Sequence, residues 1–172
     1  MQLNQKILFS EEECDFLINY KSNGIKRPHG GYLNHSGINY KQWTINRNED
    51  LEFLFTKVIS FTEETFNIKV TNFSEPAWIY QYEINDGYIM HTDDILNRCF
   101  TIGIQLNNEY EGGDLIIDYN GKRIIVNKEI GNCYIFESAL LHGVSPITSG
   151  NRYNFLTFMH SYNITINKIS LI

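Results

Sequence analysis

From Pro76 onward the chain consists of short runs rich in β-branched and aromatic residues, separated by Gly, Asn and Asp. The first group of residues favours extended strands and the second favours turns. The runs are WIYQYEI (78–84), FTIGIQL (100–106), DLIIDY (114–119), KRIIVN (122–127), NCYIFE (132–137) and RYNFLTFMH (152–160). Six or more strands at this spacing predict a β-sandwich or barrel.

Helices are expected only in the first third of the chain. Ser10 and Glu13 form a capping-box pattern that predicts a helix near residues 10–20. A second helix is predicted after Asn48, because apolar residues follow at helical spacing: Leu51, Leu54, Phe55, Val58 and Ile59. No repeat or linker divides the chain, so we expect one domain over residues 1–172. Helical support would occupy roughly 1–70, and a jelly-roll-like β core roughly 76–165.

Composition limits the classes of function. With 172 residues, of which 42% are hydrophobic, the chain can bury one sizeable core. The formal net charge of −6, without a basic run, makes nucleic acid an unlikely partner. We find neither a signal-peptide pattern nor an apolar run of about 20 residues, and therefore expect a soluble protein without membrane contact. Three widely spaced cysteines indicate free thiols in the reducing cytoplasm.

The segment YIMHTDD contains the first candidate metal ligands. His91 and Asp93 are two residues apart in an extended context, so their side chains should leave one face with Cα atoms about 6.5 Å apart. His142 in ALLHGVSP supplies a third ligand, and two imidazoles with one carboxylate form a facial triad suited to Fe(II). A histidine and an aspartate two residues apart are common by chance, and a single histidine is more often a structural residue than a metal ligand. Asp94 should point away from Asp93 and hold the following loop.

Arg152 is the second candidate site residue. It opens the alternating run RYNFLTFMH, where Arg152, Asn154, Leu156 and Phe158 share one face. A lone arginine on an apolar face needs an anion, and its planar guanidinium suits a bidentate grip on a carboxylate. The anion is either an organic acid that also chelates the metal, or a protein carboxylate in a structural ion pair.

Several motifs together resemble the prolyl 4-hydroxylase-like branch of the 2-oxoglutarate oxygenases. They are Tyr82, HTDD at 91–94, Arg98, LNNEYEGGDL at 106–115, IGNCYIFES at 130–138 and LHGVSPITSGNRY at 141–153; FSEEECDFL at 9–17 is similar to that branch's opening helix. The resemblance covers about residues 76–160 and implies a double-stranded β-helix. It also implies that 2-oxoglutarate chelates Fe(II) and pairs its 5-carboxylate with Arg152, while dioxygen takes the remaining metal position. Ascorbate is a further cofactor that the resemblance admits.

The same resemblance implies hydroxylation of a C–H bond with release of succinate and CO2. A prolyl residue in a peptide or protein is the leading substrate, and no catalytic group beyond the metal centre is expected. Alternatives are the same chemistry on a free amino acid, another side chain or an alkylated nucleobase, or a non-catalytic jelly-roll binding module. The oligomeric state is left open.

Further residues are candidates for cosubstrate contacts. The hydroxyl of Tyr82 would touch the cosubstrate or substrate. Gln105 stands where some relatives have a tyrosine that helps to bind the distal carboxylate, so Gln105 or Thr101 would donate instead. His160 matches a histidine near the cosubstrate of collagen-type relatives. However, a straight strand would place it about 26 Å from Arg152, which favours a structural role.

The remaining candidates concern the substrate and the turns. Arg98 either orients the substrate or anchors the loop that carries HTDD. In the loop-rich segment before residue 48, four residues could line a lid over the substrate or simply pack the loops: His29, His35, Tyr40 and Trp43. Gly112 and Gly113 are expected to permit a tight or positive-φ turn rather than to bind phosphate.

Overall fold

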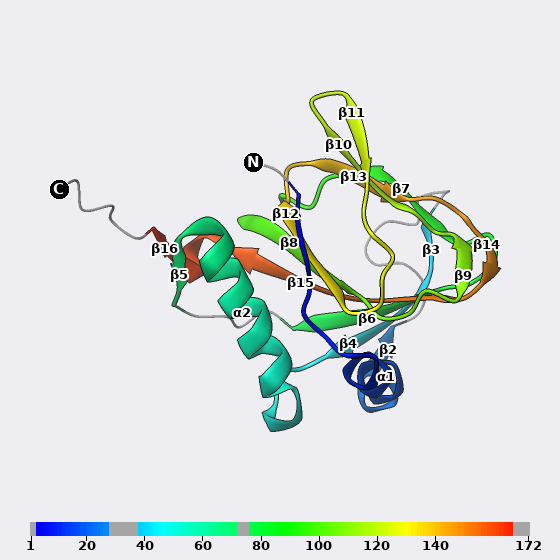
Figure 1. Ribbon diagram of the computed structural model, residues 1–172, viewed down its shortest axis with the longest axis horizontal. Coiled ribbons are helices and arrows are strands. Elements are labelled where there is room, and N and C mark those ends of the chain that lie inside the picture. The colour runs from blue at the N-terminus through cyan, green and yellow to red at the C-terminus, as the bar shows by residue number, and fades with distance from the viewer. Residues whose placement is uncertain (1–2, 28–37, 72–75, 167–172) are drawn as a thin grey trace.

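A computed structural model describes residues 3–27, 38–71 and 76–166 of the protein (Figure 1). Two antiparallel sheets dominate it. The larger sheet has seven strands in the order β1-β12-β8-β15-β6-β4-β2, and the smaller has five in the order β11-β10-β13-β7-β3. Leu115 and Ile117 of the smaller sheet form one buried cluster with Tyr134 and Phe136 of the larger. The sheets therefore face each other across a core, as the expected double-stranded β-helix requires.

The strands of the larger sheet are β1 (Asn4–Ile7), β2 (Ile25–Arg27), β4 (Lys41–Ile45), β6 (Ala77–Tyr82), β8 (Arg98–Gln105), β12 (Asn132–Glu137) and β15 (Arg152–His160). Those of the smaller sheet are β3 (Ile38–Asn39), β7 (Gly87–His91), β10 (Leu115–Tyr119), β11 (Lys122–Ile125) and β13 (Leu141–Val144). Two further pairs are β9 (Tyr110–Gly112) with β14 (Ile147–Gly150), and β5 (Ile68–Val70) with β16 (Ile164–Ile166).

Both α-helices cover the face of the larger sheet that is turned away from the smaller sheet (Figure 1). Helix α1 (Glu11–Tyr20) begins with the predicted capping box, in which Ser10 Oγ accepts from the Glu13 amide. Helix α2 (Glu52–Phe66) follows the short helix η2 (Glu49–Leu51), which is where the sequence predicted the second helix. The remaining short helices are η1 (Lys21–Asn23) and η3 (Ser161–Asn163). The apolar side chains of α1 and α2 form one buried cluster with those of the larger sheet. This cluster includes Leu17, Phe55, Ile104 and Phe155.

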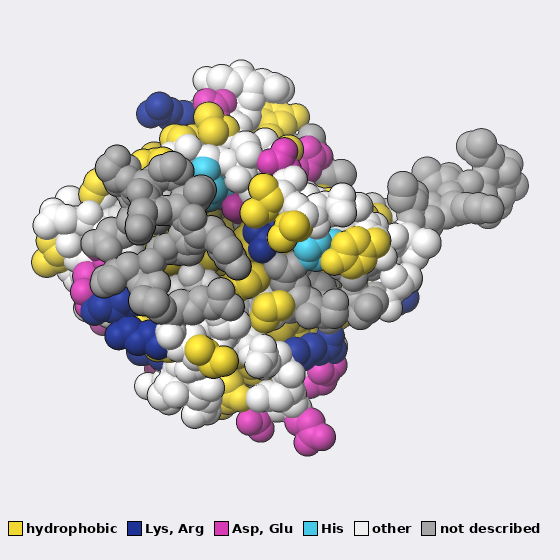
Figure 2. Space-filling model, turned by 180° about the vertical axis from the view of Figure 1, so that it is seen from behind, with side chains coloured by type: hydrophobic (Ala, Val, Ile, Leu, Met, Phe, Trp, Pro, Cys, Tyr) yellow, Lys and Arg dark blue, Asp and Glu magenta, His cyan; other side chains and the backbone are white. Residues whose placement is uncertain are grey.

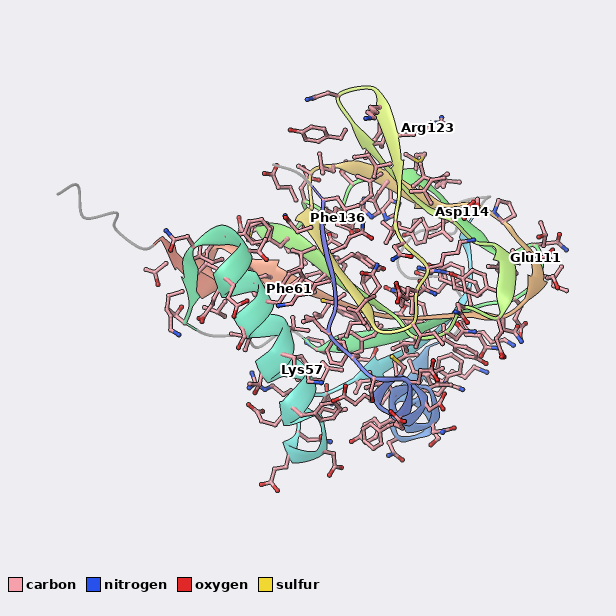
Figure 3. All side chains as sticks on the ribbon, viewed as in Figure 1. Lys57, Phe61, Glu111, Asp114, Arg123 and Phe136 are labelled. Atoms are coloured by element: carbon pink, nitrogen blue, oxygen red, sulfur yellow. The ribbon has the colours of Figure 1, made fainter. Side chains whose placement is uncertain are left out.

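The alternation of side chains along the central strands separates this core from the interior between the sheets. On β12, Cys133 and Ile135 pack with the helices, whereas Tyr134 and Phe136 belong to the cluster between the sheets. Figure 3 shows Phe61 on α2 and Phe136 on β12, which belong to the two different clusters. Consequently the interior face of the central strands is the surface on which a site can be built.

The first 70 residues contain both helices and also β1, β2 and β4, which extend the larger sheet. Gly112 and Gly113 have φ values of +70° and +62°, and a Cβ on Gly112 would lie 2.2 Å from the carbonyl oxygen of Pro146. Both glycines therefore adopt the positive-φ conformation that was expected of them. In the part of the chain that the structure describes, neither helix is long and apolar enough to cross a membrane.

Candidate active site

Three elements of the smaller sheet and its loops bring the candidate metal ligands together. His91 ends β7 and is the register partner of His142 on β13. Asp93 follows the end of β7, where its amide donates to the carbonyl oxygen of Ser138 at 2.7 Å. Strand β7 thus ends before Asp93, although the side chains of His91 and Asp93 approach each other as their spacing suggested. The loop after β7 positions Asp93 through its contact with the β12–β13 connection.

The ligand atoms of His91, Asp93 and His142 all lie within 4.8 Å of one another. His91 Nε2 is 3.4 Å from Asp93 Oδ1, and His142 Nε2 is 3.1 Å from Asp93 Oδ2. Each Nδ1 faces a carbonyl oxygen, that of Ile89 at 2.9 Å for His91 and that of Leu140 at 2.8 Å for His142. Because only an N–H can donate to a carbonyl, these bonds leave each Nε2 as the metal-binding atom. Two such nitrogens converging on one carboxylate fit a divalent cation.

Hydrogen bonds fix the carboxylate of Asp93. Thr101 Oγ1 donates to Asp93 Oδ2 at 3.0 Å and lies 3.1 Å from Ser138 Oγ. Burial alone would raise the pKa of Asp93, but hydrogen bonds with His142 and His91 hold this pKa well below its usual range. The group is therefore an ionised carboxylate at neutral pH, as a metal ligand must be.

Arg152 lies on β15 of the larger sheet and lines the same interior between the two sheets. Its side chain is buried, and its Nη2 donates to Gln105 Oε1 at 3.3 Å and to Asn154 Oδ1 at 3.2 Å. Both of these acceptors are neutral amides, and the buried Nε of Arg152 has no hydrogen-bond partner. Among the described residues, no carboxylate forms an ion pair with Arg152, so the alternative of a structural ion pair finds no support there. The guanidinium also lies 5.3 Å from the ring centre of Tyr82.

One cavity connects the candidate metal ligands with Arg152. It measures about 480 Å³, including the part open to solvent, and is lined by all three candidate metal ligands, Arg152 and Asn154. Aromatic rings from both sheets complete its wall: Tyr80, Tyr82, Tyr88, Tyr134 and Phe136. Burial raises the pKa of each of these four tyrosines, so their hydroxyls stay neutral at ordinary pH. The cavity thus has a metal-binding end, a cationic end and a neutral aromatic wall.

The candidate cosubstrate residues are distributed unequally around this cavity. Tyr82 and Thr101 line it, but the Thr101 hydroxyl is directed to Asp93 rather than toward Arg152. Gln105 contacts Arg152 without lining the cavity. His160 does not line it either, and its Nδ1 bonds the carbonyl oxygen of Leu96 at 2.8 Å. The structural role favoured for His160 agrees with this contact, which anchors the loop after Asp93.

The residues that were predicted to contact the substrate do not lie together in the structure. The Arg98 guanidinium lies 3.6 Å from the ring centre of Phe158, beside the same loop. Tyr40 packs on Tyr88 behind the cavity wall, with ring centres 5.6 Å apart. Trp43 packs against the core shared with the helices and therefore does not reach the cavity. His29 and His35 lie outside the described residues.

Two apolar side chains stand exposed beside the metal ligands. Ile95 and Leu96, in the loop after Asp93, are 59% and 73% exposed. Leu96 adopts φ +55°, a left-handed conformation that is unfavourable for a branched side chain. Figure 2 shows hydrophobic, acidic and histidine side chains next to one another on this side of the molecule. Such a surface suits contact with a partly apolar substrate.

Sequence reasoning did not identify the roles of Ser138, Tyr134 and Asn154. The alternation of β15 had placed Asn154 on the face of Arg152, without its contacts, and the alternation of β12 could have indicated that Tyr134 faces the same interior. Ser138 carries no such signal, because its contact with the Asp93 loop depends on how two distant loops meet.

The fold of two facing sheets is also found among solved structures. A prolyl 4-hydroxylase from Pseudomonas putida superposes with a TM-score of 0.72 at 15% identity, covering 92% of each chain. A prolyl hydroxylase from Trichoplax adhaerens, in complex with a peptide fragment of the hypoxia inducible factor oxygen degradation domain, superposes with a TM-score of 0.73 at 19% identity. That match covers 94% of this chain and 84% of the other. At these identities the similarity establishes the fold.

Sequence comparison shows to which proteins the chain is similar. The model of the 2OG-Fe(II) oxygenase superfamily matches residues 77–160, which carry every candidate metal ligand and Arg152. Over these residues the chain is similar to that superfamily, and its fold resembles those of solved prolyl hydroxylases. It is 30% identical over 96 residues to a PKHD-type hydroxylase from Colwellia psychrerythraea, a match that covers 51% of this chain and 43% of the relative. The chain therefore spans less than half of that relative's length.

Proposed function

We propose that this protein is an Fe(II)- and 2-oxoglutarate-dependent dioxygenase. In this proposal His91, Asp93 and His142 hold Fe(II), and Arg152 binds the 5-carboxylate of 2-oxoglutarate, with the ring of Tyr82 beside it. When bound, iron with 2-oxoglutarate and dioxygen supplies the oxidation of a C–H bond, with release of succinate and CO2. The chain's own residues orient the reactants and limit the access of water.

The observation that carries the proposal is the pairing of two sites in one cavity. Three convergent metal-ligand atoms lie at one end. At the other, a buried arginine has an Nε without a hydrogen-bond partner and contacts neutral amides and tyrosine hydroxyls, but no carboxylate among the described residues. An isolated buried guanidinium is costly unless an anion neutralises it. A small acid with a carboxylate at each end satisfies both requirements.

For the substrate we propose a prolyl residue in a peptide or protein. Support comes from the PKHD-type and prolyl hydroxylases to which the chain is similar, one of which was solved with a peptide. The exposed Ile95 and Leu96 beside the metal ligands provide an apolar surface for peptide side chains. We also propose a single domain, and a reducing intracellular location because all three cysteines are free thiols.

The experiment is an anaerobic titration of Fe(II), followed by 2-oxoglutarate, into wild type, His142→Ala, Arg152→Ala and Arg152→Lys. A metal-to-ligand charge-transfer band reports the chelate, and succinate is assayed after oxygen is admitted. We expect His142→Ala to lose iron binding and Arg152→Ala to keep iron but to need far more 2-oxoglutarate. Arg152→Lys should fall in between, because lysine keeps the charge but not the bidentate geometry.

If wild type binds iron but shows no band at any 2-oxoglutarate concentration, the oxygenase proposal is wrong and a binding module becomes the better reading. Equal iron affinity in wild type and His142→Ala would refute the triad. Assays with and without ascorbate decide whether that reductant is needed. Product mass on proline-containing peptides then separates the prolyl substrate from a free amino acid or an alkylated base.

A further inference from the structure

The amide of Gln105 is turned so that it holds Arg152 but cannot donate to a ligand. Its Oε1 accepts from Arg152, while its Nε2 donates to the Tyr110 hydroxyl at 2.8 Å and to the Asn107 carbonyl at 2.7 Å. Both hydrogens of the amide are therefore occupied. Neither Gln105 nor Tyr110 lines the cavity. A carboxylate bound by Arg152 needs its second donor from another residue.

Tyr134 is in the right place to be that donor. Its side chain projects from β12 into the interior, is 1% exposed, and lines the cavity together with Arg152 and Asn154. Its hydroxyl donates to Asn154 Oδ1 at 2.8 Å, the same oxygen that accepts from Arg152 Nη2. The tyrosine hydroxyl and the guanidinium therefore meet at one point of the cavity wall.

The ring of Tyr134 reaches this point only because residue 103 is glycine. A Cβ on Gly103 would lie 2.2 Å from both Cζ and the hydroxyl oxygen of Tyr134. Gly103 has an ordinary φ, so its lack of a side chain is required by close approach rather than by backbone conformation. Gly103 on β8 and Tyr134 on β12 are register partners, so the two residues form one packing unit.

The hydroxyl of Tyr134 can turn to a ligand without leaving a buried group unsatisfied. Asn154 Oδ1 now accepts two hydrogen bonds, one from Tyr134 and one from Arg152. When the hydroxyl rotates toward an incoming carboxylate, Asn154 keeps the bond from Arg152. Burial raises the pKa of Tyr134, so the hydroxyl carries its hydrogen at neutral pH and can donate it.

We propose that Tyr134 donates a hydrogen bond to the distal carboxylate of a 2-oxo dicarboxylic acid held by Arg152, with Gly103 making room for its ring. This inference rests on the proposed function, because it assumes that such an acid binds at Arg152. Tyr134 then supplies the donor that Gln105 does not. The hydrogen bond would contribute to selection of a dicarboxylic acid over a monocarboxylic one.

The test compares two acids that differ only at the distal end. Fe(II)-loaded wild type, Tyr134→Phe and Tyr110→Phe are titrated anaerobically with 2-oxoglutarate and with 2-oxopentanoate, which has the same five-carbon chain without the second carboxylate. We expect Tyr134→Phe to bind 2-oxoglutarate about 10-fold more weakly, as loss of a charge-assisted hydrogen bond predicts. Its affinities for 2-oxopentanoate and for iron should be unchanged, which also shows that the variant is folded.

Tyr110→Phe is the matched control, because the Tyr110 hydroxyl contacts both Gln105 and Arg152 but Tyr110 does not line the cavity. A smaller loss of 2-oxoglutarate affinity in this variant than in Tyr134→Phe supports the inference. Unchanged 2-oxoglutarate affinity in Tyr134→Phe, an equal loss for both acids, or a larger loss in Tyr110→Phe would overturn it. Wild type that binds neither acid would refute the proposed function as well, so the two failures are distinguishable.

Discussion

Replacing Thr101 with valine removes one hydroxyl from the wall of the metal site and leaves the side-chain volume nearly unchanged. Thr101 is 1% exposed, and its Oγ1 donates to Asp93 Oδ2 at 3.0 Å. A hydrogen bond to a charged group contributes about 1.5–3 kcal/mol, and loss of a partner that orients a metal ligand typically weakens metal binding about 10- to 100-fold. We therefore expect Thr101→Val to bind a divalent metal about 10- to 100-fold more weakly than wild type.

Equilibrium dialysis with Mn(II) measures this effect without oxygen chemistry. Thr101→Ser is the matched control, because serine keeps the donor and should stay close to wild type. Ser138→Ala should have a smaller effect than Thr101→Val, since Ser138 Oγ contacts the Thr101 hydroxyl at 3.1 Å rather than Asp93. The reasoning is refuted if Thr101→Val keeps wild-type affinity, or if Thr101→Ser loses as much affinity as Thr101→Val.

Other predictions concern the fold. Ser10→Ala removes the helix cap on the Glu13 amide and should lower the unfolding free energy by about 1 kcal/mol in urea titrations; no change would show that the cap is not needed. Leu96→Gly should relieve the left-handed strain at φ +55° and unfold at equal or higher urea concentration than Leu96→Ala; the reverse order would argue against strain. Burial raises the pKa of Cys14 to about 12 and raises that of Cys133 as well. Their thiolates are therefore scarce at pH 8, and iodoacetamide should modify both only after unfolding; rapid labelling of native protein would contradict this.

Strand alternation was the most informative part of the sequence. It correctly placed Arg152, Asn154 and Leu156 on one face of β15, and that face lines the cavity. Strand β13 was not predicted, because Leu141–Val144 contains Gly143 and lacks a long apolar run. Its place in the sheet comes from pairing with β10 and β7, which are distant in the sequence. Strand β13 therefore forms through pairing with distant strands rather than through a strong local β propensity.

The candidate site also depends on contacts that the sequence pattern does not predict. Residue types and spacing together with the family resemblance selected His91, Asp93 and His142, whose ligand atoms the fold brings within 4.8 Å of one another. The position of Asp93 depends on a backbone hydrogen bond to Ser138, and the orientation of the Gln105 amide depends on Tyr110 and Asn107. A one-dimensional pattern contains no information on which way an amide turns, because its neighbours in space decide it.

The charges around the cavity favour a dianionic ligand, as the proposed function requires. With Asp93 ionised and Arg152 cationic, the lining groups sum to zero, since the tyrosines stay neutral and metal-bound imidazoles are neutral. Adding a divalent iron gives a charge of +2, which matches the two carboxylates of 2-oxoglutarate. A monocarboxylate chelated to the metal would leave the Arg152 charge buried without an anion. The overall charge of −6 gives a dianion no long-range attraction, so recognition depends on these local groups.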